Sequence, residues 1–317
     1  MKKLLLIGLT LLSTNLSAKE EKKDWFNIEA SYSPWLMSWQ QNSTANKKFG
    51  SQALDVTYQI DSAVAHSATL TAHLFSWEFD LNLITVPESE NSNKQADSMD
   101  SLSATLSYLD FIGDTELKYS YYTGEFKGAV IASDLDRFGG SVFKSEVTQH
   151  NFVINTQWDI GFGVRVAEYD LPQDVYLVEQ ANANQVLLSG LANMEYDATF
   201  YQITFSKDKL FQFNNGSHIG VIASAGFGEM ISSGDFLQQV EQLVGDKSMG
   251  DADAYFVEYD IFYADKFSLT KSIDAHWQLG YRANSIEAEF SPSGQYTLVA
   301  DFETEFKGPY ISFNAIW

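Results

Sequence analysis

The last nine residues, Pro309-Tyr-Ile-Ser-Phe-Asn-Ala-Ile-Trp317, alternate in character and decide how the rest of the chain is read. Successive side chains of an extended chain point to opposite faces, so Ile311, Phe313 and Trp317 share one face. Chain termini of soluble domains usually fray, which makes an alternating strand ending in Trp unusual among them. The stretch predicts a terminal β-strand with one apolar face. An ordinary half-buried strand that ends a soluble all-β domain is the alternative.

The beginning of the chain has the features of a secretory signal peptide. Two lysines precede the apolar run Leu4–Leu12, and a small residue, Ala18, stands before the polar run 19–24. The apolar run is shorter than the roughly 20 residues that a membrane-spanning helix needs. We therefore expect residues 1–18 to be a cleaved signal peptide and residues 19–24 to be a polar lead-in to the mature domain.

The composition excludes several classes of protein. The formal net charge is −22, so the chain lacks the basic surface of a general nucleic-acid binder. There is no cysteine, and hence no disulfide framework. Aromatic residues make up 15% of the chain, and these residues favour strands and membrane interfaces. An exported, acidic, aromatic-rich chain fits an outer-membrane barrel or a periplasmic β protein.

Stretches of about ten alternating residues recur along the chain, the length with which a tilted strand crosses a bilayer. The alternation changes phase near Phe75-Ser76, which predicts a tight turn or bulge there. Twelve strands are expected, at about 25–38, 70–74, 77–83, 102–110, 116–123, 147–156, 159–169, 196–205, 218–228, 255–264, 273–283 and 309–317. The segment 39–66 holds a strand-like piece at 54–60; the stretches 87–100 and 170–195 are expected to be loops, and 236–244 a short amphipathic helix.

Short and long connections alternate between these strands, as do the short periplasmic turns and long extracellular loops of bacterial barrels. With its terminal aromatic strand, the mature chain resembles Gram-negative outer-membrane β-barrel proteins. The resemblance implies an all-β fold: a closed, antiparallel, up-and-down transmembrane barrel of about 12 strands (10–14 possible) formed by residues 25–317. It also implies location in the outer membrane, both termini in the periplasm, contact with outer-membrane lipid and lipopolysaccharide, and assembly by the barrel-assembly machinery.

The resemblance also assigns roles to aromatic residues. The terminal strand would carry the assembly signal, formed by Ile311, Phe313 and Trp317. Indole prefers the membrane–water boundary, and five tryptophans fall near the expected periplasmic strand ends. The expected girdle is Trp25, Trp77, Trp158, Trp277 and Trp317, while Trp35 and Trp39 fall at the upper end of the first strand.

If the apolar faces meet lipid, the alternate positions line a polar lumen. The expected charge network there is Glu29, Glu78, Asp80, Glu116, Lys118, Arg165, Glu258, Asp260, Asp274 and Arg282. Guanidinium groups can pair with several carboxylates and relieve their repulsion. The network is either structural or selects a solute, and its excess of acid favours cations or neutral solutes over anions.

Chemistry beyond transport has weaker signals. Asp274 and His276 share one face of a strand, an arrangement in which a carboxylate can orient an imidazole as general base. No histidine spacing indicates a metal site, and no motif indicates a cofactor. Glycine pairs at 161/163 and 226/228 are expected to ease close strand packing. A narrow porin-like channel for small cationic or neutral solutes is the favoured function; a lipid- or peptide-modifying hydrolase and a structural or surface-binding barrel without a pore are the alternatives.

Overall fold

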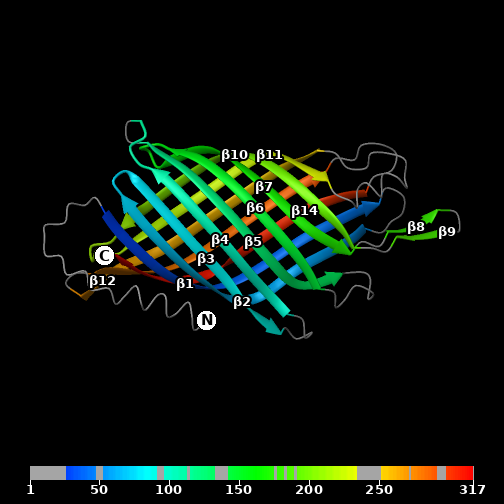
Figure 1. Cartoon of the computed structure of the whole chain (residues 1–317), viewed down its shortest axis with the longest axis horizontal. Helices are drawn as coiled ribbons and strands as arrows, with labels where there is room; N and C mark the ends of the chain where they lie inside the picture. The colour runs from blue at the N-terminus through cyan, green and yellow to red at the C-terminus, as the bar shows by residue number, and fades with distance from the viewer. Residues whose placement is uncertain are drawn as a thin grey trace.

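The computed structural model describes residues 26–47, 53–90, 96–112, 115–132, 142–174, 177–181, 184–188, 191–233, 251–270, 273–290 and 298–316. Its strands are β1 (Phe26–Lys47), β2 (Ala53–Leu74), β3 (Trp77–Glu90), β4 (Ala96–Tyr108), β5 (Glu116–Ala132), β6 (Val142–Asn155), β7 (Ile160–Asp174), β8 (Leu177–Ala181), β9 (Asn184–Leu188), β10 (Leu191–Gln212), β11 (His218–Ser233), β12 (Asp251–Thr270), β13 (Ile273–Phe290) and β14 (Leu298–Ile316). Twelve strands form one antiparallel sheet, and β8 and β9 form a separate hairpin. Figure 1 shows the twelve as a tilted barrel with the hairpin projecting from one end.

The sheet closes on itself, because β1 pairs with both β2 and β14. Register partners on the outer face lead once around the barrel through Ile28, Ala72, Phe79, Leu106, Tyr119, Phe152, Val164, Tyr201, Phe227, Tyr255, Glu287, Glu303 and Asn42. This path returns to β1 at Asn42, 14 residues beyond its start at Ile28. With about 3.3 Å per residue and about 4.8 Å between strands, that offset tilts the strands by about 40° and gives a backbone diameter of about 24 Å. The predicted closed twelve-stranded barrel is confirmed.

The two ends of the barrel differ. Tight connections, including the predicted turn at Phe75-Ser76, join strands at one end, which we call the turn end. The opposite end, from which the β8–β9 hairpin projects, is the loop end (Figure 1). Glu29 pairs with Ile316, so β1 begins and β14 finishes at the turn end. Toward the loop end β2 pairs directly with β5, through Val56–Gln59 and Ala129–Ala132, so β3 and β4 leave the ring there.

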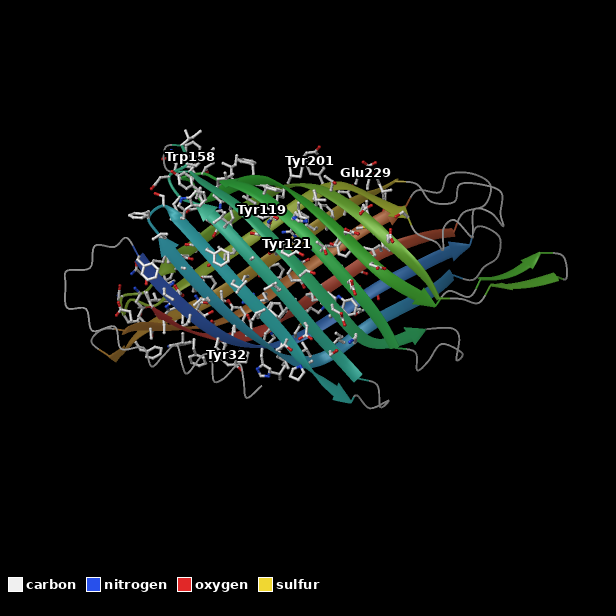
Figure 2. The ribbon with its side chains drawn as sticks, in the orientation of Figure 1. Tyr32, Tyr119, Tyr121, Trp158, Tyr201 and Glu229 are labelled. Atoms are coloured by element: carbon white, nitrogen blue, oxygen red, sulfur yellow. The ribbon has the colours of Figure 1, made fainter. Side chains whose placement is uncertain are left out.

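The outer face carries an apolar band. On β12, for example, Tyr255 is 53% exposed and Ile261 is 50% exposed, whereas their neighbours in the chain face inward. Toward the loop end the outer face becomes acidic, and carboxylates on adjacent strands lie directly opposite one another: Asp100, Glu125, Glu146, Asp170 and Glu195. Figure 2 shows Tyr201 and Glu229 projecting from the outside of the wall, with Glu229 nearer the loop end. An apolar band with a charged border suits a barrel that crosses a bilayer.

No helix long and apolar enough to cross a membrane occurs among the residues that the structure describes.

The strands are longer than predicted at the loop end. The segment 39–66 is mostly strand, since β1 continues to Lys47 and β2 starts at Ala53. Residues 87–100 were predicted to be a loop, but β3 reaches Glu90 and β4 starts at Ala96. The stretch 170–195 likewise contains the end of β7, the β8–β9 hairpin and the start of β10. The prediction failed because a strand beyond the apolar band meets water on its outer face and loses the alternation, while its backbone ladder continues. The helix predicted at 236–244 and the signal peptide lie outside the described residues.

Candidate functional site: the barrel lumen

Alternation along the strands determines which side chains face the lumen. On β12, Val257, Tyr259 and Ile261 are exposed on the outside, while Glu258 and Asp260 lie between them on the inner face. Inner-face positions hold nine members of the expected network: Glu29, Glu78, Asp80, Glu116, Lys118, Arg165, Glu258, Asp260 and Arg282. Asp274 has the same orientation along β13 but is exposed at the turn end. These nine residues therefore face the lumen, and a role for them in selecting a solute stays a prediction.

The lumen near the turn end is polar. Opposite residues on adjacent strands pair there: His73 Nδ1 lies 3.1 Å from Glu78 Oε2, and Asn155 Nδ2 donates to Glu116 Oε2 at 2.8 Å. Thr71 Oγ1 donates to Asp80 Oδ1 at 2.5 Å. Ile222 lies opposite Asp260, where this section meets the middle of the lumen, and is still 42% exposed on the inner face. This part of the lumen is therefore accessible to water.

Two arginine–carboxylate pairs lie in the middle of the lumen; one joins strands that are not neighbours, and the other joins register partners on β12 and β13. Arg165 Nη2 lies 2.7 Å from Glu258 Oε2, which joins β7 to β12, and the Arg165 side chain is 6% exposed. Arg282 Nη2 lies 3.4 Å from Asp260 Oδ2, and Tyr310 donates its hydroxyl hydrogen to Asp260 Oδ1 at 2.8 Å. The two guanidinium groups stack on aromatic rings, Arg165 at 4.0 Å from the centroid of Phe256 and Arg282 at 4.1 Å from that of Tyr310. Planar guanidinium suits such combined pairing and stacking.

This middle layer contains polar atoms that find no hydrogen-bond partner among the described residues. They are Nε of Arg165 and of Arg282, Nε1 of Trp35 and Oε1 of Gln202. Arg165 and Gln202 are each 5% exposed. A buried polar group without a partner costs about 1–3 kcal/mol. Hydrogen bonds to water would therefore stabilise these groups of the middle layer.

An aromatic cluster fills the lumen on the loop side of the arginines. We call it the aromatic seal; it consists of Trp39, Phe126, Tyr169, Tyr196, Phe302 and Phe306. Trp39 stacks on Phe126 with ring centroids 5.3 Å apart, and Phe306 lies 5.4 Å from Phe126. Except for the partly buried Phe306, every member is at most 3% exposed. The seal excludes water from this section.

The seal spans the whole width of the lumen. Phe302 on β14 lies 5.4 Å from Tyr169 on β7 and 5.1 Å from Tyr196 on β10. Neither β7 nor β10 is a neighbour of β14 in the sheet, so these contacts reach across the barrel. The direct β2–β5 pairing removes two strands from the ring near this level, which reduces the backbone diameter to about 20 Å. Side chains from opposite walls can meet across that distance.

The candidate catalytic residues do not form a catalytic arrangement. Asp274 and His276 lie on β13 near the turn end, where His276 is half-buried and Asp274 exposed, and no hydrogen bond joins them in the described structure. A general base needs its orienting partner within hydrogen-bond reach. Among the described side chains no group of three or more His, Cys, Asp or Glu residues is arranged to hold a metal ion.

The structure describes only some of the residues expected to form the tryptophan girdle and the assembly signal. Trp77 is 46% exposed and Trp158 is 70% exposed, both at the turn end, and Figure 2 shows Trp158 there. Trp277 is partly exposed on the outer face. In the terminal strand Phe313 is 47% exposed and Ile311 is intermediate. Trp25 and Trp317 lie outside the described residues, and the roles of all these residues stay predictions.

The aromatic seal lies in a section of the lumen that was predicted to be polar. Trp35 and Trp39, placed at the upper end of the first strand, are in fact buried in the lumen with Met37. The alternation could have revealed their orientation: Leu36 is exposed and faces lipid, so the odd-numbered residues on either side of it must face inward. The polar prediction holds for the turn-end half of the lumen only.

Comparisons with known proteins find only distant similarities in structure. No protein-family model and no curated protein sequence matches the chain. The outer-membrane protease OmpT from Escherichia coli is similar in structure, with a TM-score of 0.33 and 10% identity over 94% of this chain and 99% of that one. The toluene transporter TodX of Pseudomonas putida gives a TM-score of 0.31 and 8% identity over 92% and 90%. A FadL homologue of Pseudomonas aeruginosa gives 0.28 and 9% over 93% and 90%. At these values no residue or activity is transferred to this chain.

Proposed function

We propose that this chain is an integral outer-membrane barrel whose lumen is closed to ions and which takes up small, uncharged, apolar solutes. The observation that carries the proposal is the aromatic seal, which spans the lumen with side chains at most 3% exposed apart from Phe306. An ion that entered the seal would lose its hydration without gaining a partner, which is prohibitive in a medium of low dielectric constant.

A small apolar molecule meets no such barrier. It can replace one ring contact of the seal by another, and its transfer from water into the seal is favourable by about 25 cal/mol for each Å² of apolar surface buried. The observation separates this function from the cation channel that the acidic lumen suggested, because the acidic section ends below the seal. A separate observation disfavours the hydrolase: no hydrogen bond joins Asp274 and His276 in the described structure.

Two measurements on the purified protein test the proposal. In planar bilayers the folded protein should give no ion conductance above that of the lipid alone. N-phenyl-1-naphthylamine, an uncharged aromatic fluorophore, should bind with an increase in fluorescence above that of protein-free vesicles.

A matched pair of variants on β14 locates the binding. Phe306 packs against Trp39 and Phe126, so Phe306→Gln puts an amide into the seal and should weaken binding about tenfold, equivalent to about 1.4 kcal/mol. Phe313 lies on the outer face of the same strand and is 47% exposed, so Phe313→Gln should leave binding unchanged. Stable conductance steps, or a lack of fluorophore binding by folded protein, would contradict the proposal. The second result would favour a structural barrel.

A further inference from the structure

Strand β2 changes partners partway along its length. From Leu74 to His66 it pairs with β3, and from Gln59 to Val56 it pairs with β5. Between these two stretches, residue 60 and residues 63–65 keep their ladder to β1, but residues 60–65 have no ladder partner on the other side in the described structure. Opposite them, residues 86–90 of β3 pair with β4 alone. We call this interruption, between residues 60–65 of β2 and 86–90 of β3, the seam.

The sequence provides two reasons for the seam. Pro87 carries no backbone N–H and cannot donate to a ladder, so β3 loses a hydrogen bond one residue past Val86. The register between β1 and β2 shifts between Met37 and Trp39, which places an extra residue in β2 between Ile60 and Ala63. A bulge of this kind bends its strand and increases the local twist. Both features turn β2 away from β3 at the same height.

The described side chains on the inner side of the seam are apolar. Ala65 is 0% exposed, Ile60 is 1% exposed, and Val86 and Met99 are each 2% exposed. These residues belong to the same buried cluster as Trp39 and Phe126 of the aromatic seal. The interior of the seam is thus continuous with the seal.

The outer side of the seam lies within the apolar band. Val64 is 49% exposed beside it on β2, and Leu83 is 42% exposed on β3. Leu36 on β1, the register partner of Val64, is 48% exposed. The described side chains therefore form an apolar path that runs from the lipid-facing surface through the wall to the seal.

We propose that the seam is a lateral entrance through which small, uncharged, apolar solutes pass between the bilayer and the aromatic seal. The inference rests on the proposed function and adds the route. In the described structure, opening it breaks no ladder hydrogen bonds along residues 60–65 on the β3 side, and it displaces the apolar contacts of Ile60, Ala65 and Val86. A route along the barrel axis from the turn end would instead carry the solute past the paired arginines and carboxylates.

The absence of cysteine from the chain makes a clean lock possible. Ala65→Cys combined with Val86→Cys places two thiols at inner positions one step beyond the last β2–β3 pair, His66 and Thr85. The matched control is Ser67→Cys with Ile84→Cys, which are register partners on the inner face of the intact ladder. Opposite residues in an antiparallel pair, such as the control pair, lie about 4.5–5.5 Å apart at Cα, within the range that disulfides bridge, and the seam pair is one residue beyond such a pair.

The assay is the rate at which N-phenyl-1-naphthylamine preloaded into lipid reaches the protein. Oxidation of the seam pair should slow the rate at least about tenfold, which needs only about 1.4 kcal/mol of added barrier, and reduction should restore it. The oxidised control pair should bind at the wild-type rate. An unchanged rate with the seam disulfide formed, or equal slowing by both pairs, would overturn the entrance.

A variant without a disulfide gives an independent check. Ala63 is partly buried against the cluster, and Ala63→Leu fills the inner side of the seam. It should slow binding, whereas Val64→Leu on the lipid-facing side should not. If the fluorophore binds the wild type at the same rate as Ala63→Leu, the route is wrong but the proposed function stands. If it does not bind the wild type at all, the proposed function itself fails.

Discussion

Replacing Phe302 by Ala tests the seal through the stability of the barrel. The Phe302 ring is 2% exposed and is held by Tyr169 at 5.4 Å and Tyr196 at 5.1 Å, across the lumen from its own strand. Truncation of a fully buried Phe to Ala costs about 3–5 kcal/mol, of which each aromatic pair supplies about 0.5–1.5 kcal/mol. We expect the free energy of unfolding of Phe302→Ala to fall by an amount in this range.

The matched control is Phe313→Ala on the outer face of the same strand, where the ring is 47% exposed. Its exposed side faces lipid, which fills the space left by the ring, so the loss should lack the cavity cost and be about 1.5–3 kcal/mol. Both values come from reversible guanidinium chloride unfolding in lipid vesicles, followed by tryptophan fluorescence. Equal losses for the two variants, or a loss below about 1 kcal/mol for Phe302→Ala, would show that the ring does not bridge a packed lumen.

Three further outcomes are expected. Phe302→Ala should also let ions pass, and the current should prefer cations, because the acidic residues below the seal outnumber Lys118; they are Glu29, Glu78, Asp80 and Glu116. A reversal potential in a KCl gradient that indicates a preference for anions would contradict this. Glu258→Gln should lower the free energy of unfolding by about 1.5–3 kcal/mol, because it weakens the hydrogen bond from buried Arg165. In the same unfolding assay Glu125→Gln should cost less than about 1 kcal/mol, because Glu125 forms an exposed pair with Lys127. Gly228→Ala should prevent β10 and β11 from pairing, because its Cβ would lie 1.8 Å from the carbonyl oxygen of Thr199. Gly216→Ala, at a turn with open space around it, should still fold, and circular dichroism and resistance to protease distinguish the two variants.

The sequence was sufficient for the barrel because the apolar band imposes a two-residue period on each strand. Ile28, Tyr32 and Leu36 on β1 and Leu81 and Leu83 on β3 show that period clearly, as a lipid-facing wall requires. The period disappears toward the loop end, where Gln40 and Asn42 face water, and there the predicted strands stopped too early. Backbone ladders continue without any requirement on the side chains.

The lumen was harder to predict because its contacts join strands that are distant in sequence. Alternation identified Arg165, Arg282, Glu258 and Asp260 as inward-facing, but their pairing depends on the radius and offset of the closed barrel. The seal depends on the same geometry, since Phe302 meets Tyr169 only across the diameter. The seam required knowledge of the register, although Pro87 was a visible sign of an interrupted ladder.

Cysteine accessibility along one strand tests the division of the lumen most directly. Ile222 and Met230 both lie on the inner face of β11, but Ile222 is 42% exposed below the seal and Met230 is 0% exposed. In a chain that has no other thiol, Ile222→Cys in the folded protein should react readily with a charged, water-soluble maleimide, and Met230→Cys should react only after unfolding. Equal labelling of the two positions in the folded barrel would mean that water fills the lumen from end to end, and that no aromatic seal closes it.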